Sequence, residues 1–254
     1  MTISILSTEM MGTRTVFDDT VDVLGGLKPG SPEVYSIAEL GPQSRRRLVA
    51  LERAADSGRV EMMFRDYFAE SGDIRFSTYL VADAFAHGVI GRAVASFVTI
   101  GRVWDTGAEN LAVRTDIEGG LDWAGVRDTS LRMLPDDPSA GSPGTVVLPC
   151  EQALAHWLAC RSRSTLAPVF DGLAEVSSCS VETLWSVVGE CVLGAATIVP
   201  TFAGTSTEPG YRRGRLVLQA LHDSDLAVRR RSALPRTPGS GPIPVRDRGW
   251  RSVR

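Results

Sequence analysis

The sequence predicts an α+β fold that is mostly helical, with a small antiparallel sheet in the middle of the chain. Apolar residues recur at helical spacing over 73–101 and again over 149–161, 163–177 and 181–198. Short segments of strand-like composition, separated by turn residues, lie within 110–134. The chain has 254 residues, of which 43% are hydrophobic, and this is enough to bury a core without disulfides or metals.

Turn-forming residues such as the stretch GGLKPG punctuate the start of the chain, so we expect an irregular N-terminal lead-in over 1–35. From Ser44 the apolar residues fall at helical spacing. Gly58 interrupts this pattern, and VEMMFRDYF at 60–68 resumes it. These helices open an N-terminal helical and sheet part that spans 36–134.

The clearest helix is predicted over 73–101. Side chains at steps of three and four residues trace one stripe along it: Phe76, Leu80, Ala84, His87, Ile90, Val94 and Phe97. Asp83 lies on the same stripe, one turn before His87. Gly88 and Gly91 have no side chain and would let a neighbouring element pack closely.

The sheet is predicted from 110–117 and 121–126, which flank a Gly-Gly turn, and from a third strand at 129–134. Residues 135–144 are dense in proline, glycine, serine and aspartate and form a loop. A C-terminal helical part follows over 145–226.

Helices in this C-terminal part are expected over 149–161, 163–177, 181–198 and about 212–222. Pro168 would start or kink the second of them, and Ser180 would cap the third. The tail over 227–254 contains eight arginines and one aspartate, whereas the whole chain has a formal charge of −3. Such a tail could contact phosphate groups, but pairing with the acidic body of the chain is the simpler expectation, and no nucleic-acid partner is expected.

Several classes of protein are disfavoured by what the sequence lacks. The four cysteines contain no C-x-x-C pair, so neither a zinc motif nor a redox motif is indicated. The longest apolar stretch, 89–100, is interrupted by Arg92, and we expect no membrane partner and a cytoplasmic location. Fingerprints of nicotinamide, ATP and serine-hydrolase chemistry are missing too.

Two stretches resemble the siderophore-iron reductases, the FhuF-like proteins. The first is STLAPVFDGLAEVSSCSVETLWSVVGECVLGA at 164–195, which is similar to a helix pair of that family with its Leu184–Trp185 step. The second is the C-terminal tail, where Arg229–Arg230–Arg231–Ser232 and the turn RTPGSG at 236–241 match the frame around the family's iron–sulfur cluster.

The tail departs from that family at the cluster ligands. Ala233 and Leu234 stand where the family has a cysteine pair, and PIPV at 242–245 fills the place of the second pair. A 2Fe–2S cluster requires four such ligands. The resemblance therefore implies an FhuF-like fold with a cleft for a siderophore-type metabolite, and a 2Fe–2S cluster is not expected.

His87 is the leading candidate for chemistry, with Asp83 one turn away to orient its imidazole. It would act as a general base, or as a ligand if haem or non-haem iron is bound; the alternative is a core imidazole bonded to Asp83 or to a carbonyl. Glu190 is a third catalytic candidate if it faces the cleft and an ordinary surface charge if it does not.

Four further residues are candidates to bind the ligand: Tyr79, Arg114, Trp185 and Arg230. Arginine suits bidentate recognition of carboxylates, and tryptophan can form an aromatic wall or belong to the core. These features predict a tailoring enzyme of specialised metabolism that acts on a small polar metabolite, with no cofactor of its own and with a homodimer left open. The alternatives are a non-catalytic metabolite- or siderophore-binding protein and a ferric-siderophore reductase with borrowed haem or flavin.

Overall fold

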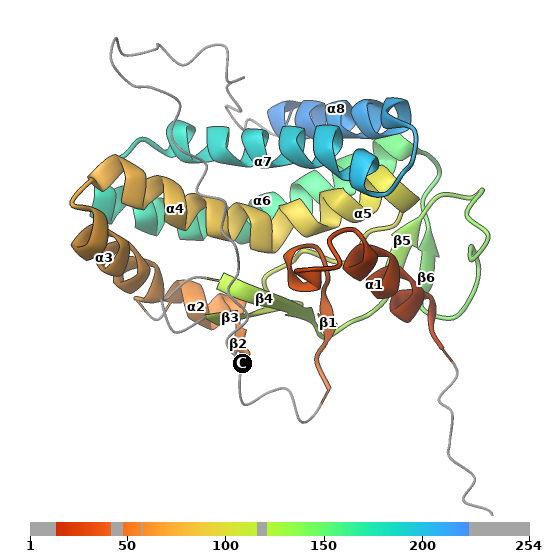
Figure 1. Ribbon diagram of the computed structural model, residues 1–254, viewed down its shortest axis with the longest axis horizontal. Coiled ribbons are helices and arrows are strands. Elements are labelled where there is room, and N and C mark those ends of the chain that lie inside the picture. The colour runs from red at the N-terminus through yellow and green to blue at the C-terminus, as the bar shows by residue number, and fades with distance from the viewer. Residues whose placement is uncertain (1–13, 42–47, 57, 116–120, 224–254) are drawn as a thin grey trace, which may run out of the picture.

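The computed structural model describes residues 14–41, 48–56, 58–115 and 121–223, and it confirms the predicted α+β, mostly helical fold (Figure 1). The helices are α1 (Val16–Gly26), the short η1 (Pro32–Val34), α2 (Leu51–Asp56), α3 (Arg59–Ser71), α4 (Ile74–Ala86), the π-helical η3 (His87–Gly91), α5 (Arg92–Ile100), α6 (Glu151–Ser177), α7 (Val181–Phe202) and α8 (Thr207–Asp223). The strands are β1 (Ala38–Glu39), β2 (Val49–Ala50), β3 (Leu111–Thr115), β4 (Leu121–Val126), β5 (Leu131–Met133) and β6 (Thr145–Val147).

The N-terminal lead-in contains a helix, α1, that the prediction for 1–35 missed. Thr15 caps it: its hydroxyl oxygen accepts the backbone N–H of Asp18 at 3.1 Å, and the Asp18 carboxylate accepts the backbone N–H of Thr15 at 2.8 Å. This reciprocal arrangement is a capping box. Phe17 and Leu24 bury the inner face of the helix in the core. The glycines at 25–30 mark the end of this helix rather than an irregular lead-in.

The predicted helix over 73–101 is confirmed as the continuous series α4, η3 and α5. The Asp73 side chain caps its start by accepting the backbone N–H groups of Arg75 and Phe76, and Gly101 ends it in a left-handed conformation. Between residues 81 and 98 every residue is buried except Asp83 and His87, which are half-buried. The helix is therefore surrounded by protein on most sides. The single apolar stripe predicted from the sequence covers only part of its buried surface.

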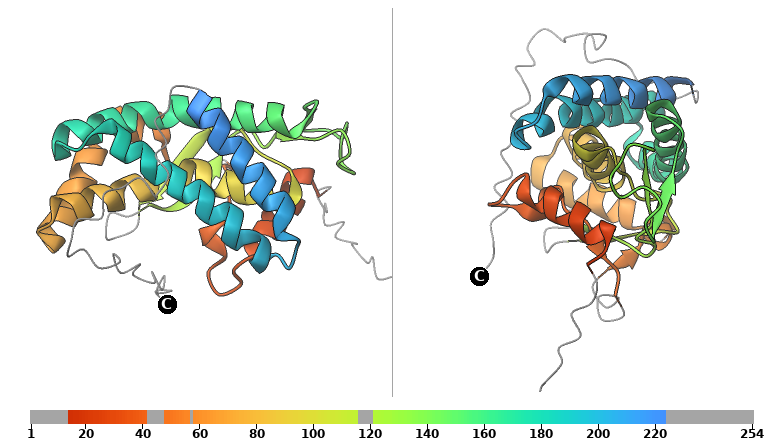
Figure 2. Two further views of the ribbon diagram at one scale, coloured as in Figure 1. Left: turned by 90° about the horizontal axis from the view of Figure 1, so that it is seen from above. Right: turned by 90° about the vertical axis from the view of Figure 1, so that its right-hand side faces the viewer.

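The long helices α6, α7 and α8 pack against this central helix (Figure 2). The two segments predicted over 149–161 and 163–177 are one helix, α6, because Pro168 is accommodated inside it with its ring exposed. Ser180 caps α7 as predicted, accepting the backbone N–H of Thr183 at 3.3 Å. The final helix, α8, begins at Thr207 and is longer than predicted.

The main sheet has the strand order β1-β4-β3-β2. The β3–β4 pair is antiparallel, as predicted. The strands β2 and β1 were not predicted: β2 pairs antiparallel with β3, and β1 joins β4 in parallel, so the sheet is mixed. The third predicted strand, β5, instead pairs in parallel with β6 in a separate two-stranded sheet. The helix expected from Ser44 begins only at Leu51, after β2, and residues 42–47 lie outside the described residues.

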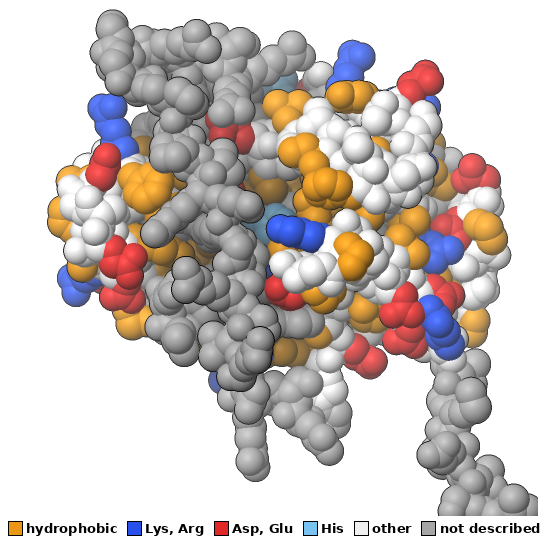
Figure 3. All heavy atoms as spheres, viewed as in Figure 1, with side chains coloured by type: hydrophobic (Ala, Val, Ile, Leu, Met, Phe, Trp, Pro, Cys, Tyr) orange, Lys and Arg blue, Asp and Glu red, His pale blue; other side chains and the backbone are white. Residues whose placement is uncertain are grey.

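Among the described residues, two helical stretches are long and apolar enough to cross a membrane, Ile74–Ile100 and Val181–Phe202. Their most apolar windows are 89% and 61% buried inside the protein, as in the core helices of soluble proteins. Hydrophobic side chains do reach the surface over α7 (Figure 3), where Leu193, Ile198 and Phe202 are exposed. These features are weak evidence for a membrane span.

Candidate functional site

The candidate site lies where the π-helical turn η3 meets the short helix η1. His87 Nε2 lies 2.6 Å from the carbonyl oxygen of Val34. The Arg92 guanidinium, whose residue is only 2% exposed, donates to the same carbonyl at 3.1 Å and to that of Glu33 at 3.0 Å. These bonds tie the N-terminal segment to the central helix. π-helical turns inside α-helices occur frequently at functional sites.

The bond to Val34 determines which imidazole nitrogen carries the hydrogen in the neutral ring. Because a carbonyl oxygen can only accept, Nε2 of His87 carries the hydrogen, and in the neutral ring the lone pair is on Nδ1. Nδ1 faces Gly91 and lies 3.0 Å from the position that a Cβ would occupy there. The Tyr35 ring approaches the imidazole edge-on, with 6.0 Å between the ring centroids.

Helix α7 closes this site from another side. The Cys191 sulfur lies 2.7 Å from the same Cβ position on Gly91, a distance too short for any side chain, so glycine is required at this contact. Cys191 Sγ and His87 Nδ1 therefore flank Gly91 together. We call Tyr35, Asp83, His87, Arg92 and Cys191 the π-turn cluster.

Burial and charge keep two members of the π-turn cluster protonated. Burial raises the pKa of the Cys191 thiol far above its ordinary value; the nearby Asp83 carboxylate raises it further, and Arg92 opposes this effect. Burial likewise raises the pKa of the Tyr35 phenol, with a smaller contribution from Cys191. At neutral pH the site thus presents a neutral thiol and a neutral phenol beside an imidazole.

The structure brings together some of the predicted site residues. Asp83 and His87 lie in the π-turn cluster, and Glu190 is half-buried on α7 directly before Cys191. Tyr79 is half-buried on α4, one helical turn before Asp83. These residues come from α4, η3 and α7, which pack against one another.

The other predicted ligand-binding residues lie elsewhere. Trp185 is 5% exposed and packs edge-on against Phe170 with 5.0 Å between ring centroids, which places it in the core rather than in a ligand wall. Arg114 is half-buried on β3, in the sheet. Arg230 lies outside the described residues.

Tyr35 and Cys191 were not predicted as site residues. Tyr35 falls in the lead-in that was expected to be irregular, and Cys191 looked like one more apolar residue on the stripe of α7. The crossing of α7 over Gly91 brings Cys191 to the site, and no spacing in the sequence encodes that crossing.

Of the two His87 ring nitrogens, only Nδ1 could ligate a haem or iron. Nε2 already donates to Val34, and ligation through it would remove the bond that holds η1. The cysteine beside it is held as a thiol, whereas metals bind the thiolate. Within the described residues, no group of three or more His, Cys, Asp or Glu side chains is placed to hold a metal ion. The bond from His87 to the Val34 carbonyl is also the one expected of a core imidazole.

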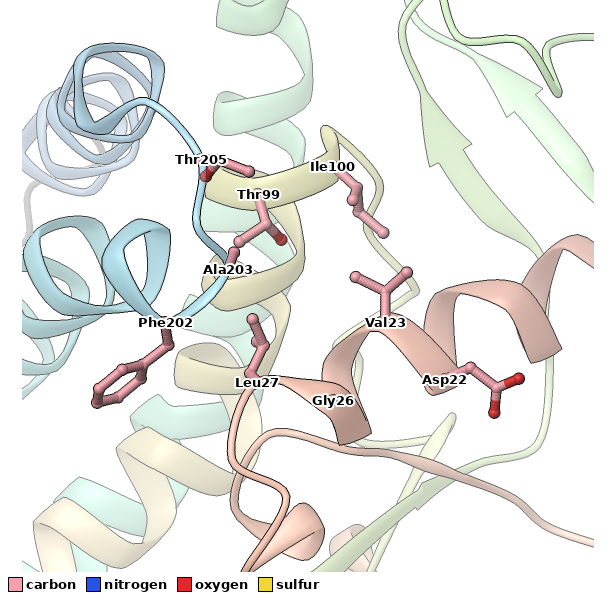
Figure 4. Close-up of a pocket in the computed structure, with 9 residues that line it drawn as sticks. All are labelled: Asp22, Val23, Gly26, Leu27, Thr99, Ile100, Phe202, Ala203 and Thr205. Atoms are coloured by element: carbon pink, nitrogen blue, oxygen red, sulfur yellow. The ribbon is translucent and has the colours of Figure 1, made fainter.

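A surface pocket of about 290 Å³ lies apart from the π-turn cluster, between α1, the end of α5 and the turn from α7 to α8 (Figure 4). Its lining is largely apolar, with Val23, Leu27, Ile100 and Phe202 around it. The carboxylate at its edge, Asp22, is paired with Arg14. Two threonines, Thr99 and Thr205, also line it, and none of the predicted site residues does.

No family model matches the sequence, and no curated protein or solved structure is found to be similar to it.

Proposed function

We propose that this chain is a tailoring enzyme that binds a small polar metabolite at the π-turn cluster and moves a proton to or from it. The observation that carries the proposal is the convergence of Tyr35, Asp83, His87 and Cys191 around one π-helical turn. Four polar groups of different chemistry rarely meet at half-buried positions of a helix core without a functional reason.

Each group has a distinct part in this proposal. His87 exchanges the proton through Nδ1, since Nε2 is held by Val34. Asp83 stabilises the imidazolium that forms, because a carboxylate one turn away on a helix is within reach. The neutral Tyr35 and Cys191 donate hydrogen bonds to oxygen or nitrogen atoms of the metabolite.

The resemblance to the FhuF-like proteins supports the choice of ligand. A cleft of that kind would accept a molecule rich in oxygen and nitrogen, of the siderophore type, and the chain would act on it in the cytoplasm. The missing cluster cysteines argue against a reductase that works through its own iron–sulfur centre.

A second candidate is a binding protein without catalysis. The observation that favours it is that His87 and Arg92 both donate hydrogen bonds to backbone carbonyls of η1. On this alternative the polar groups hold the N-terminal segment in place and shape the site, and no proton is transferred.

His87→Gln separates the two candidates. The glutamine amide can still donate to the Val34 carbonyl, but it cannot exchange a proton near neutral pH. The substrate panel consists of a hydroxamate siderophore, a catecholate siderophore and the ferric complex of each, incubated with the protein and followed by mass spectrometry. If the enzyme hypothesis holds, the wild type converts a panel member and His87→Gln lowers turnover by about 100-fold or more, with little change in melting temperature.

The exposed His222, at the end of α8, provides the matched control, and His222→Gln should leave turnover unchanged. Binding without turnover in the wild type would favour the second candidate. Full turnover in His87→Gln would contradict the role of His87, and conversion that occurs only with an added reductant would point to a reductase.

A further inference from the structure

A histidine and a cysteine stand side by side on the outer face of α6, far from any role in the π-turn cluster. His156 and Cys160 are one helical turn apart, both are exposed, and His156 Nε2 lies 3.5 Å from Cys160 Sγ. Imidazole nitrogen and thiolate sulfur are the two ligand types that zinc prefers in proteins.

The distance between these two atoms matches the spacing of two ligands on one zinc ion. Zinc bonds are about 2.0 Å to nitrogen and about 2.3 Å to sulfur, and a tetrahedral angle between them puts the two ligand atoms about 3.5 Å apart. The same distance suits a hydrogen bond from the thiol to the imidazole. Binding of the metal would therefore replace the thiol proton without moving either side chain far.

Arg163 is half-buried one helical turn after Cys160, and two further arginines near the pair, Arg161 and Arg132, are already engaged. Arg161 donates to Asp105 at 2.7 and 3.0 Å and also pairs with Glu109. Arg132 lies over the Trp157 ring, 4.6 Å from its centroid, and donates to the Ser130 carbonyl. The guanidinium groups of Arg161 and Arg132 are thus held by other partners.

One chain supplies only half of a tetrahedral site, because the described residues contain no group of three or more metal-binding side chains. The surface around the pair suits a second copy of the chain. The exposed positions of α6 at steps of four residues carry no charge over four turns: Gln152, His156, Cys160, Ser164 and Pro168. Two such helices can approach closely across a twofold axis, which would bring two His156–Cys160 pairs together.

We propose that His156 and Cys160 form half of a zinc site that the same pair of a second copy completes as a Cys₂His₂ centre. The proposal does not depend on the function of the π-turn cluster, which lies on other helices. It predicts one metal ion for two chains and a dimer that forms when the metal is added.

Cobalt(II) titration of the full, reduced chain tests this proposal, because cobalt replaces zinc and reports its own coordination. We expect the absorption bands of tetrahedral cobalt with a sulfur-to-cobalt charge-transfer band, saturating at one cobalt for two chains. Added zinc should bleach these bands. Light scattering coupled to size-exclusion chromatography should show a monomer without metal and a dimer with it.

Three variants locate the site. His156→Gln and Cys160→Ser should each weaken cobalt binding by more than about tenfold and abolish the metal-dependent dimer, whereas Cys150→Ser, at another exposed cysteine, should change neither. Failure of the wild type to bind cobalt would overturn the proposal, as would binding that survives both variants. Saturation at one cobalt for each chain, without a dimer, would overturn the shared site.

Discussion

Ser96 presents a buried hydroxyl group that is not matched by a hydrogen-bond acceptor. It lies on α5 and is fully buried, and no partner for its Oγ is found in the part of the chain that the structure describes. A buried polar group without a partner destabilises the fold, and alanine is also the better helix former. We expect Ser96→Ala to raise the free energy of unfolding by about 1 kcal/mol in a urea titration.

Ser162 provides the control for this prediction, because it is equally buried but bonded. Its Oγ lies 3.0 Å from Thr106 Oγ1. Ser162→Ala removes this partner and should lower the free energy of unfolding by about 1 kcal/mol. If the two substitutions had the same sign, satisfaction of the hydroxyl group would not be what determines the effect.

The candidate site was predictable at the residue scale only within one helix. Asp83 and His87 are four residues apart, and helical periodicity alone puts them on one side of α4 and η3. Tyr35 and Cys191 reach the same place from elements that lie 52 residues before and 104 residues after His87. Such contacts depend on how helices cross, and the periodicity of a single segment contains no information about the crossing.

At the scale of elements, two glycines allow α8 to lie close to α7. A Cβ on Gly214 would stand 2.4 Å from Ala196 Cβ, and one on Gly210 would stand 2.5 Å from Pro200 Cγ. Gly214→Ala must therefore push the helices apart. We expect it to lower the free energy of unfolding by roughly 1–3 kcal/mol in a denaturant titration.

Gly172 on α6 is the matched control, since it also lies in a helix but has open space where a Cβ would stand. Gly172→Ala should raise the free energy of unfolding by roughly 0.5–1 kcal/mol, through helix propensity alone. Equal effects of the two substitutions would argue against close packing between α7 and α8.

Helix positions were the most predictable part of the fold, and their exceptions have physical causes. The periodicity over 73–101 identified the central helix but not its π-helical turn, because one wide turn barely shifts an apolar pattern. Pro168 was expected to start or kink a helix, yet α6 continues through it. The parallel strand β1 has only two residues, too few for any alternation to show.

At the scale of the whole molecule, ion pairs join segments that are distant in sequence. Arg102, after α5, binds Asp137 in the 135–144 loop with two hydrogen bonds of 2.7 and 2.8 Å. Arg212 and Arg213 on α8 bind Glu151 at the start of α6. The bond from Arg212 has the largest effect on the pKa of Glu151; burial opposes it and the bond from Arg213 adds to it, so that this pKa is lowered to about 2. Below this pKa the carboxyl is protonated and the two helices lose the pair.

The Arg102–Asp137 pair should make the fold sensitive to acid. Burial raises the pKa of Asp137, but the Arg102 bond and the Ser139 N–H outweigh it, so the folded-state pKa lies below the ordinary value. The stabilisation is therefore present above about pH 4 and is lost as the pH falls further. Asp137→Asn should lower the free energy of unfolding by about 2–4 kcal/mol at pH 7 and by less at pH 3, as measured in urea titrations at both pH values.

The adjacent Asp136 is exposed and provides the control, and Asp136→Asn should change the free energy of unfolding by less than about 0.5 kcal/mol. A cost for Asp137→Asn that stayed the same at pH 3 would show that the carboxylate charge is not its source.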